Sequence, residues 1–439
     1  MQKRNSYALV LGGGGAKGSY QIGAWKALKE MGFEFHSIIG TSVGALNGAV
    51  IALDDYDSAL HMWENITIDK VINIPKEFLK DGKININPAN IKHIKDFQKS
   101  LSDNSGLDNT PLKNLLTHYI DEKKIRKSGI DLGVVTYEFN SLKPCEIFMD
   151  AMKEGELHDY LLASSTFPGF KLTTIDGKKY VDGGLHDNVP ISTAKERGYK
   201  RLIVIDVSGL GVHKKPDIYN TETIYIKNSS DTGGVFDFDP ENARRNIDMG
   251  YRDTMKIFGK YTGIEYFYEH DDRTVHDLEL VMVSDAFMKE CRKEFDSKIV
   301  NFLGKPVVNV IRNILPENFR NFRDIVIPLV ECAALSLKLD KDRLYDYKEF
   351  IRVLWEKYDG YRSNYKPVNN AVDLVINKLK NPLTMFRISH NEYENILGML
   401  LNSLRDFKLY SKTVLNIFPH FIPAKLAFIL LDLYFRENG

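Results

Sequence analysis

Cysteine is scarce in this chain, which has 3 among its 439 residues. Cys145, Cys291 and Cys332 lie far apart and show none of the short spacings at which cysteines hold a metal ion. A small, odd number of cysteines is typical of free thiols in a reducing compartment. We therefore expect no disulfide framework, no metal site and a cytoplasmic location.

The chain also lacks an excess of charge and a long hydrophobic run. Lys and Arg together number 59, as do Asp and Glu, so the formal net charge is zero. This balance argues against nucleic acid as a partner, because such binding draws on an excess of basic side chains. No segment approaches the roughly 20 apolar residues of a membrane span. The apolar stretch near the basic N-terminus is too short for a signal peptide, so any membrane contact must depend on local features.

The first half of the chain alternates strand and helix patterns. Apolar runs at 7–11 and 35–39 predict buried strands, and a helical spacing follows each of them, at 19–31 and 43–53. This order predicts an α/β fold with a mainly parallel sheet and right-handed crossovers. Further predicted strands lie at 130–137, 146–149, 171–175, 179–181, 201–207 and 223–226, and further helices at 156–163 and 191–197. The more polar residues 61–115 predict an insertion with short helices over the sheet.

The second half is expected to be all-helical. Helical spacing is found at 241–258, 284–303, 319–339, 347–357, 371–379, 392–404 and 423–435. We place a domain transition near residues 260–280. The last helix, PAKLAFILLDLYF, is apolar nearly all round, a pattern shared by buried core helices and membrane anchors.

Four consecutive glycines follow the first predicted strand, in LVLGGGGAKGSYQIG at residues 9–23. Residues 13–18 fit the G-x-G-x-x-G pattern of dinucleotide sites, but no carboxylate ends the second strand to hold a ribose. A nucleoside-triphosphate loop needs its lysine after the last glycine, whereas Lys17 precedes Gly18. Two interpretations remain for this glycine turn (residues 12–18): an oxyanion-binding site or a purely structural turn.

The second predicted strand ends in GTSVG, residues 40–44, which matches the G-x-S-x-G nucleophile elbow. Ser42 would sit on a sharp turn between the strand and a small apolar helix. Gly40 and Gly44 would let the backbone pack closely around it. The N-terminal amides of the following helix would face a negative charge formed at this serine.

The order of these segments predicts that the glycine turn lies beside Ser42. Adjacent parallel strands end at the same edge of a sheet, so both turns would meet there. Amides of the turn could then donate to the oxygen of a tetrahedral intermediate, each worth roughly 3 kcal/mol in the transition state. Lys17 either adds positive charge to this place or is solvated.

A serine nucleophile needs a base, and the histidines give no clear candidate. His186 and His213 follow at a suitable distance in the chain, but neither has an informative setting. Asp182 is the best-marked acid, in YVDGGLHDNVPI at residues 180–191. It ends a predicted strand and precedes Gly183 and Gly184. The same Asp-Gly pair is also common in ordinary hairpin turns.

Together these motifs resemble the patatin-like phospholipase family in order and spacing. The resemblance rests on residues 13–18, 40–44 and 182–184, and on ASSTFPGF at 163–170, which is similar to an Ala-Ser-x-x-x-Pro block. DGGLHDNVPI is similar to an Asp-Gly-Gly-x-x-x-Asn-x-Pro signature, and residues 233–259 look like the continuation in bacterial members. The resemblance covers residues 5–210, with that continuation to about 265. It does not extend to the helical region at 266–439.

The resemblance implies a three-layer α/β/α sandwich and a Ser–Asp dyad without histidine. Ser42 would be the nucleophile and Asp182 the general base, acting on acyl esters of glycerophospholipids at a membrane or micelle surface. The oxyanion hole would comprise Gly13, Gly14, Gly15 and Ala16. The residues that support the motifs would be Gly18, Gly40, Gly44, Gly183 and Gly184. No cofactor is implied, and we expect activity that is independent of Ca²⁺.

Two other functions are compatible with the same sequence. The site could transfer the acyl group to an acceptor alcohol instead of water. Alternatively, the protein could bind lipid or act as a scaffold through its helical region.

Overall fold

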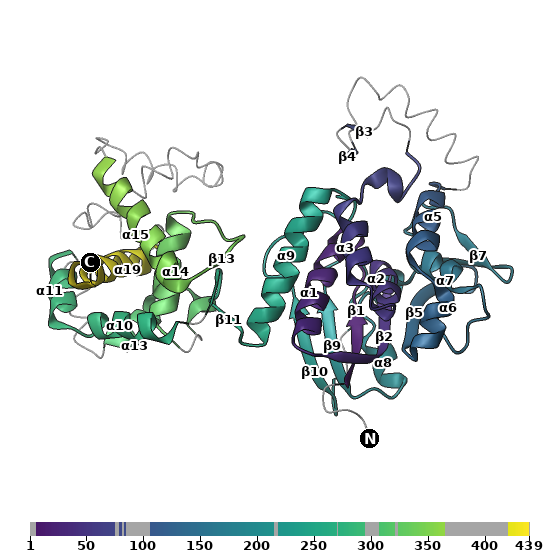
Figure 1. Cartoon of the computed structure of the whole chain (residues 1–439), viewed down its shortest axis with the longest axis horizontal. Coiled ribbons are helices and arrows are strands. Elements are labelled where there is room, and N and C mark those ends of the chain that lie inside the picture. The colour runs from purple at the N-terminus through teal and green to yellow at the C-terminus, as the bar shows by residue number, and fades with distance from the viewer. Residues whose placement is uncertain are drawn as a thin grey trace. The chain divides into compact units, whose positions relative to one another are not determined.

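The computed structural model describes residues 6–74, 79–80, 83–84, 106–214, 218–269, 271–294, 307–320, 324–364 and 420–438. The chain divides into two compact units, Met1–Phe258 and Gly259–Gly439 (Figure 1). Each unit has a hydrophobic core of its own.

An eight-stranded sheet forms the centre of the first unit. Five neighbouring strands are parallel, in the order β10 (Glu222–Lys227), β9 (Arg201–Asp206), β1 (Ser6–Leu11), β2 (Glu34–Thr41) and β5 (Asp131–Glu138). The antiparallel pairs involve the other three strands, β6 (Lys143–Phe148), β8 (Lys178–Asp182) and β7 (Thr173–Ile175). The predicted α/β class with a mainly parallel sheet is confirmed.

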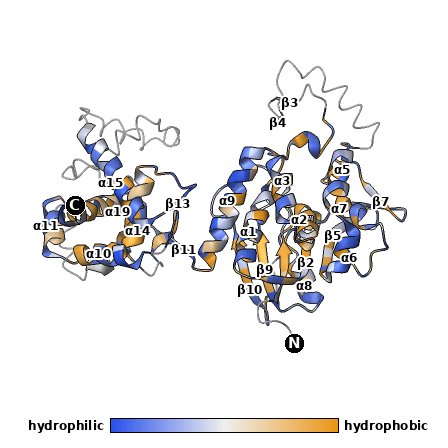
Figure 2. Cartoon of the chain, in the orientation of Figure 1, coloured by the Kyte–Doolittle hydropathy of each residue, from blue (hydrophilic) through white to orange (hydrophobic). Residues whose placement is uncertain are grey.

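Both faces of this sheet are buried beneath helices, which gives three layers. In β1, Leu9 and Leu11 point into the larger core, while Ala8 and Val10 point into the smaller core on the other face. The central strands β1 and β9 accordingly carry uninterrupted apolar runs, Ala8–Leu11 and Leu202–Ile205, which are orange in Figure 2. Helices that contribute to the larger core include α1 (Ser19–Glu30), α2 (Val43–Ala52), α3 (Tyr56–Glu64), α5 (Thr110–Tyr119), α7 (Leu157–Ser164) and α9 (Pro240–Ile257). The smaller core is covered by α8 (Ile191–Glu196).

Helices α1 and α9 approach each other closely through two glycines. A Cβ on Gly23 would lie 1.8 Å from the carbonyl oxygen of Ile247, and one on Gly250 would lie 2.0 Å from that of Tyr20. The Tyr20 hydroxyl also donates to the buried Asp253 at 2.9 Å. Through these contacts α9 completes the core of the first unit.

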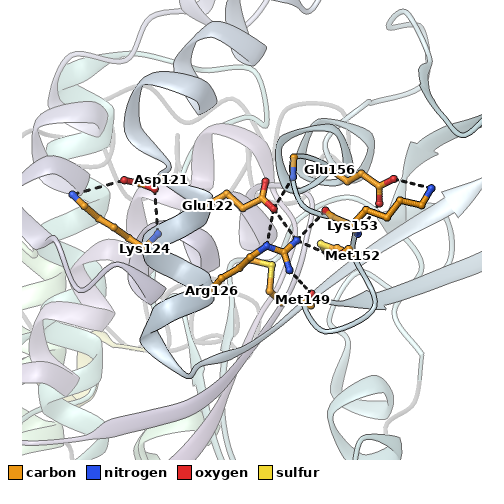
Figure 3. A network of polar contacts seen from close by, with 9 residues as sticks. Asp121, Glu122, Lys124, Arg126, Met149, Met152, Lys153 and Glu156 are labelled. Atoms are coloured by element: carbon orange, nitrogen blue, oxygen red, sulfur yellow. Dashed lines mark hydrogen bonds and ion pairs between the residues drawn. The ribbon is translucent and has the colours of Figure 1, made fainter.

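A polar network around Arg126 fixes the segment that precedes α7 (Figure 3). Arg126 lies on α6 (Glu122–Ser128) and its Nε donates to Glu122 at 2.8 Å. Its other nitrogens donate to three main-chain carbonyl oxygens, those of Met149, Met152 and Lys153, at 3.1, 3.0 and 2.9 Å. The segment Met149–Lys153 is thereby held against α6.

The second unit is mainly helical, as predicted. Its described helices are α10 (Asp272–Met282), α11 (Asp285–Glu294), α13 (Val307–Ile314), α14 (Val326–Ser336), α15 (Tyr347–Asn364) and α19 (Phe421–Asn438). The apolar helix α19 is buried in the core of this unit, where Phe428 stacks on Tyr358 with ring centroids 4.0 Å apart. This favours the core-helix interpretation of the last predicted helix. No helix in the described ranges is both long and apolar enough to cross a membrane.

The second unit also differs from the prediction in detail. A three-stranded sheet is formed by β11 (Tyr261–Thr262), β12 (Phe267–Glu269) and β13 (Leu344–Tyr345). These strands are only two or three residues long, and β13 pairs with β12 from far along the chain, so no local pattern marks them. Helices α10 and α13 were not predicted, although Val275, Leu278 and Met282 of α10 are buried at helical spacing. The predicted helices at 371–379 and 392–404 lie outside the described residues.

Candidate active site

Ser42 occupies a strained turn between β2 and α2. Its backbone has φ 54° and ψ −128°, a conformation that L-residues rarely adopt and that costs roughly 1–3 kcal/mol. A Cβ on Gly40 would lie 2.3 Å from the carbonyl oxygen of Gly44, and one on Gly44 would lie 2.3 Å from that of Leu11. Both glycines of the G-x-S-x-G motif are therefore required by close packing around the serine.

Ser164, which the sequence analysis did not select as a site residue, holds this strained turn. Its hydroxyl accepts from the main-chain N–H of Ser42 at 2.9 Å and donates to the carbonyl oxygen of Val135 at 2.6 Å. The side chain of Thr41 donates to the carbonyl oxygen of Asp187 at 2.8 Å. These bonds tie the turn to β5 and to the loop after β8. Ser164 belongs to the ASSTFPGF block, which was the available signal in the sequence.

Strand β5 brings Ser42 and Asp182 together. Its residue Val135 pairs with Thr41 at the end of β2, and the next residue, Thr136, pairs with Asp182 at the end of β8. Since β6 occupies the other edge of β5 over these residues, β2 and β8 end side by side on one edge. The hydroxyl of Ser42 donates to Oδ2 of Asp182 at 2.6 Å.

The carboxylate of Asp182 is buried and has few partners. Its side chain accepts from the Ser42 hydroxyl through Oδ2 and from the N–H of Gly184 through Oδ1, the latter at 2.7 Å. Burial raises its pKa to about 6, against the lowering effect of these two hydrogen bonds. A Cβ on Gly183 would lie 2.2 Å from the carbonyl oxygen of Val135, so the residue after Asp182 must be small.

The glycine turn lies beside Ser42. A Cβ on Gly13 would be 3.1 Å from the Cβ of Ser42, and one on Gly18 would be 2.4 Å from Cγ2 of Val43. The turn therefore packs directly against the serine and against the start of α2, as its place in the sequence predicts.

The amides of this turn have different partners. Those of Gly12, Gly13 and Ala16 donate to the carbonyl oxygens of Ile205, Asn188 and Val235 at 3.0, 2.9 and 2.9 Å. Within the described residues, no hydrogen bond engages the amides of Gly14 and Gly15, and both glycines line the cavity described below. Of the four predicted oxyanion residues, only these two have amides that are not already bonded to a carbonyl.

Neither Lys17 nor the histidines considered from the sequence contact the dyad. The ammonium of Lys17 lies 3.4 Å from the carbonyl oxygen of Ser208. His213 lies near the carbonyl oxygen of Gly209, and His186 lies near Lys214. No histidine in the described ranges hydrogen-bonds to Ser42 or Asp182.

An apolar cavity of about 260 Å³ opens at Ser42 and Asp182. Its walls come from α2, α3 and α5, and from the loops after α7, β8, β9 and β10. The residues that line it include Leu46, Val50, Trp63, Leu112, Leu116, Phe167, Phe170 and Phe236. Both flanks of the predicted insertion at 61–115 therefore contribute to the wall. The arrangement places a hydroxyl, a buried carboxylate and two amides at one end of a hydrophobic chamber.

Comparisons with known proteins match residues 9–195 to the family model described as Patatin-like phospholipase. Patatin-like phospholipase domain-containing protein 7 of Rattus norvegicus is 27% identical over 219 residues, which are 49% of this chain and 14% of the rat protein. Lysophospholipase NTE1 of Kluyveromyces lactis is 28% identical over 207 residues, 46% of this chain and 12% of that protein. The chain thus spans a small part of the length of these relatives. The crystal structure of VipD from Legionella pneumophila is 13% identical, with a TM-score of 0.35, over 96% of this chain and 91% of that one.

Proposed function

The chain contains a patatin-like phospholipase domain at residues 9–195, and from this premise we propose that it hydrolyses acyl esters of phospholipids through a Ser42–Asp182 dyad. The observation that carries the proposal is the 2.6 Å hydrogen bond from the Ser42 hydroxyl to the buried carboxylate, at the wall of an apolar cavity. The cavity supplies a place for an acyl chain, whose burial contributes about 0.8 kcal/mol per methylene.

In the acylation step, Oγ of Ser42 attacks the carbonyl carbon of the ester while its proton passes to Oδ2 of Asp182. The carbonyl electrons move to the oxygen, and the amides of Gly14 and Gly15 donate hydrogen bonds to the resulting oxyanion. Gly13 and Ala16, whose amides are already bonded to carbonyl oxygens, hold the ends of the turn. Collapse of the intermediate breaks the ester bond, and the departing alkoxide takes the proton from Asp182.

In the second step, a water molecule attacks the acyl group on Ser42. Asp182 accepts the proton from this water and returns it to Oγ, which releases the fatty acid. A carboxylate with an ordinary pKa is a weak base toward an alcohol. Burial raises the pKa of Asp182 to about 6 and so strengthens this base, while leaving it ionised near neutral pH.

The mouth of the cavity suggests how the lipid arrives. Leu185, Leu210 and Phe236 line the cavity and also expose 47%, 68% and 37% of their surface to solvent. An apolar rim that continues into an apolar chamber suits a substrate presented at a membrane or micelle surface.

The test is release of fatty acid from phospholipid vesicles in EDTA. We expect activity in the wild type and its loss in Ser42→Ala and Asp182→Asn. Ser37→Ala is the matched control, because Ser37 is a buried serine of β2, the strand before Ser42, and its hydroxyl donates to the carbonyl oxygen of Asp131. Release of fatty acid by Ser42→Ala at the wild-type rate would overturn the proposal. Loss of wild-type activity in EDTA that added calcium restores would contradict a metal-free reaction.

A further inference from the structure

Three buried side-chain amides hold the glycine turn by its carbonyl oxygens. The bonds are Gln21 Nε2 to Gly12 at 2.7 Å, Asn188 Nδ2 to Gly13 at 3.2 Å, and Asn47 Nδ2 to Gly18 at 2.9 Å. Gln21 and Asn47 are fully buried, and Asn188 is 1% exposed. The donors come from α1, α2 and the loop after β8, so three separate elements converge on one turn.

Peptide geometry links one of these carbonyls, that of Gly13, to an amide of the proposed oxyanion hole. The C=O and N–H of one planar trans peptide unit point in opposite directions. A bond from Asn188 to the carbonyl of Gly13 therefore turns the N–H of Gly14 the opposite way. Asn188 also accepts from the N–H of Gly13 through its main-chain oxygen, at 2.9 Å. Asn188 thus holds Gly13 from both sides and fixes the peptide that carries the Gly14 amide.

The two helix amides are connected to the wall of the cavity. Nδ2 of Asn47 donates to Oε1 of Gln21 at 2.8 Å, and Oδ1 of Asn47 accepts from the indole N–H of Trp63 at 3.0 Å. Trp63 lies on α3 and lines the cavity. A continuous chain of hydrogen bonds therefore leads from the cavity wall, through Asn47 and Gln21, to the carbonyl of Gly12.

Buried amides are costly to keep unless they are bonded, and bonded networks of this kind hold their members rigidly. Each of these three side chains donates one hydrogen bond to a carbonyl oxygen of the glycine turn. Rigid placement is what an oxyanion site requires, since its donors must already be aimed at the developing charge.

We propose that Gln21, Asn47 and Asn188 are positioning residues that aim the oxyanion-binding amides, and that Trp63 couples this brace to the acyl chain in the cavity. The inference rests on the proposed function and adds that the length of the bound acyl chain controls the alignment of the same site. An acyl chain that packs on Trp63 stabilises the indole in the position from which it supports Asn47. Long acyl chains then align the turn better than short ones.

The first test compares Asn188→Asp with the wild type on a long-chain ester. The carboxylate has the same shape but no N–H for the Gly13 carbonyl, so we expect kcat to fall by about 100-fold with KM little changed. Asn246→Asp is the matched control, because Asn246 is a fully buried amide that donates to the carbonyl oxygen of Thr232, outside the glycine turn. Gln21→Met provides a second variant if Asn188→Asp does not fold, with a fall in kcat expected again.

The second test uses Trp63→Phe, which keeps an aromatic ring and removes the indole N–H. We expect kcat to fall about tenfold on a long-chain ester and by a clearly smaller factor on a soluble butyryl ester, whose short chain does not reach the indole. An equal change on both esters, or none on either, would overturn the coupling through Trp63. Wild-type kcat in both Asn188→Asp and Gln21→Met, with Ser42→Ala inactive, would overturn the brace alone. An active Ser42→Ala would instead contradict the proposed function.

Discussion

The two units each bury a carboxylate, and the two carboxylates have different surroundings. Glu331 on α14 is fully buried and accepts from the N–H groups of Ile264 and Glu265, at 2.8 and 2.7 Å, and from the hydroxyl of Tyr268. Asp182 accepts from one amide and from the hydroxyl of Ser42, and it faces a cavity. Burial by itself therefore does not mark a site. A strained nucleophile and an adjoining chamber distinguish Asp182 from a carboxylate that joins main-chain segments.

The largest expected effect comes from replacing each of these two carboxyl groups by an amide. Asp182→Asn should lower kcat by at least about 10³-fold, because the amide cannot accept the proton of Ser42. Glu331→Gln should leave kcat unchanged and lower the free energy of unfolding of the second unit by about 2 kcal/mol. Activity assays and urea denaturation of both variants measure the contrast. Equal loss of activity in the two variants would remove the distinction between the carboxylates.

A second expected effect is a pH dependence that belongs to Asp182. Its pKa is about 6 in the folded protein, above its ordinary value of 3.8, so the folded state binds this proton more tightly. The stability it contributes is present below about pH 4 and is lost as the pH rises through about 6. Activity should change in the opposite direction and rise through about pH 6 as the base ionises.

The measurement compares unfolding and kcat/KM of the wild type between about pH 4 and 8, with Asp182→Asn as the reference for unfolding. The difference between the two unfolding curves isolates Asp182 from Asp187, whose pKa burial also raises to about 6. If kcat/KM had no ionisation near pH 6, another group would have to serve as the base.

The smallest expected effects are changes in the free energy of unfolding when one arginine in each unit is replaced. Arg126→Met removes the bonds to Glu122 and to three main-chain carbonyls, which should lower the free energy of unfolding by about 2 kcal/mol. Arg352 and Glu356 form an ion pair at 3.3 Å with both side chains more than half exposed. Arg352→Met should cost less than about 0.5 kcal/mol. Urea denaturation checks both, and similar losses would mean that the Arg126 network adds little to stability.

The sequence predicted the parts of the fold that depend on local pattern. The buried runs of β1 and β2 and the helices that follow them have clear periodicities, and their order requires parallel pairing. The small sheet of the second unit was missed because the pairing of Phe267 with Leu344 involves residues far apart in the chain. The periodicity of a strand or a helix describes neighbouring residues only, so it cannot reveal a partner so far away in the chain.

The candidate site was predictable to a similar extent. Ser42, Asp182 and the glycine turn lie in recognisable sequence motifs, because close packing around them leaves room only for glycine at certain positions, such as Gly40, Gly44 and Gly183. Ser164 and Asn188 also lie in recognisable blocks, yet their partners are main-chain atoms of other segments. The sequence could not show which amides of the turn are already bonded, since that depends on the loops at Asn188 and Val235.

The central claim is that Asp182 activates Ser42. The most direct measurement is the rate at which an alkyl fluorophosphonate labels the protein, with the labelled residue identified by mass spectrometry. The account predicts a single adduct on Ser42 and labelling at least about 100-fold slower in Asp182→Asn. An adduct on another residue, or an unchanged rate in Asp182→Asn, would contradict it.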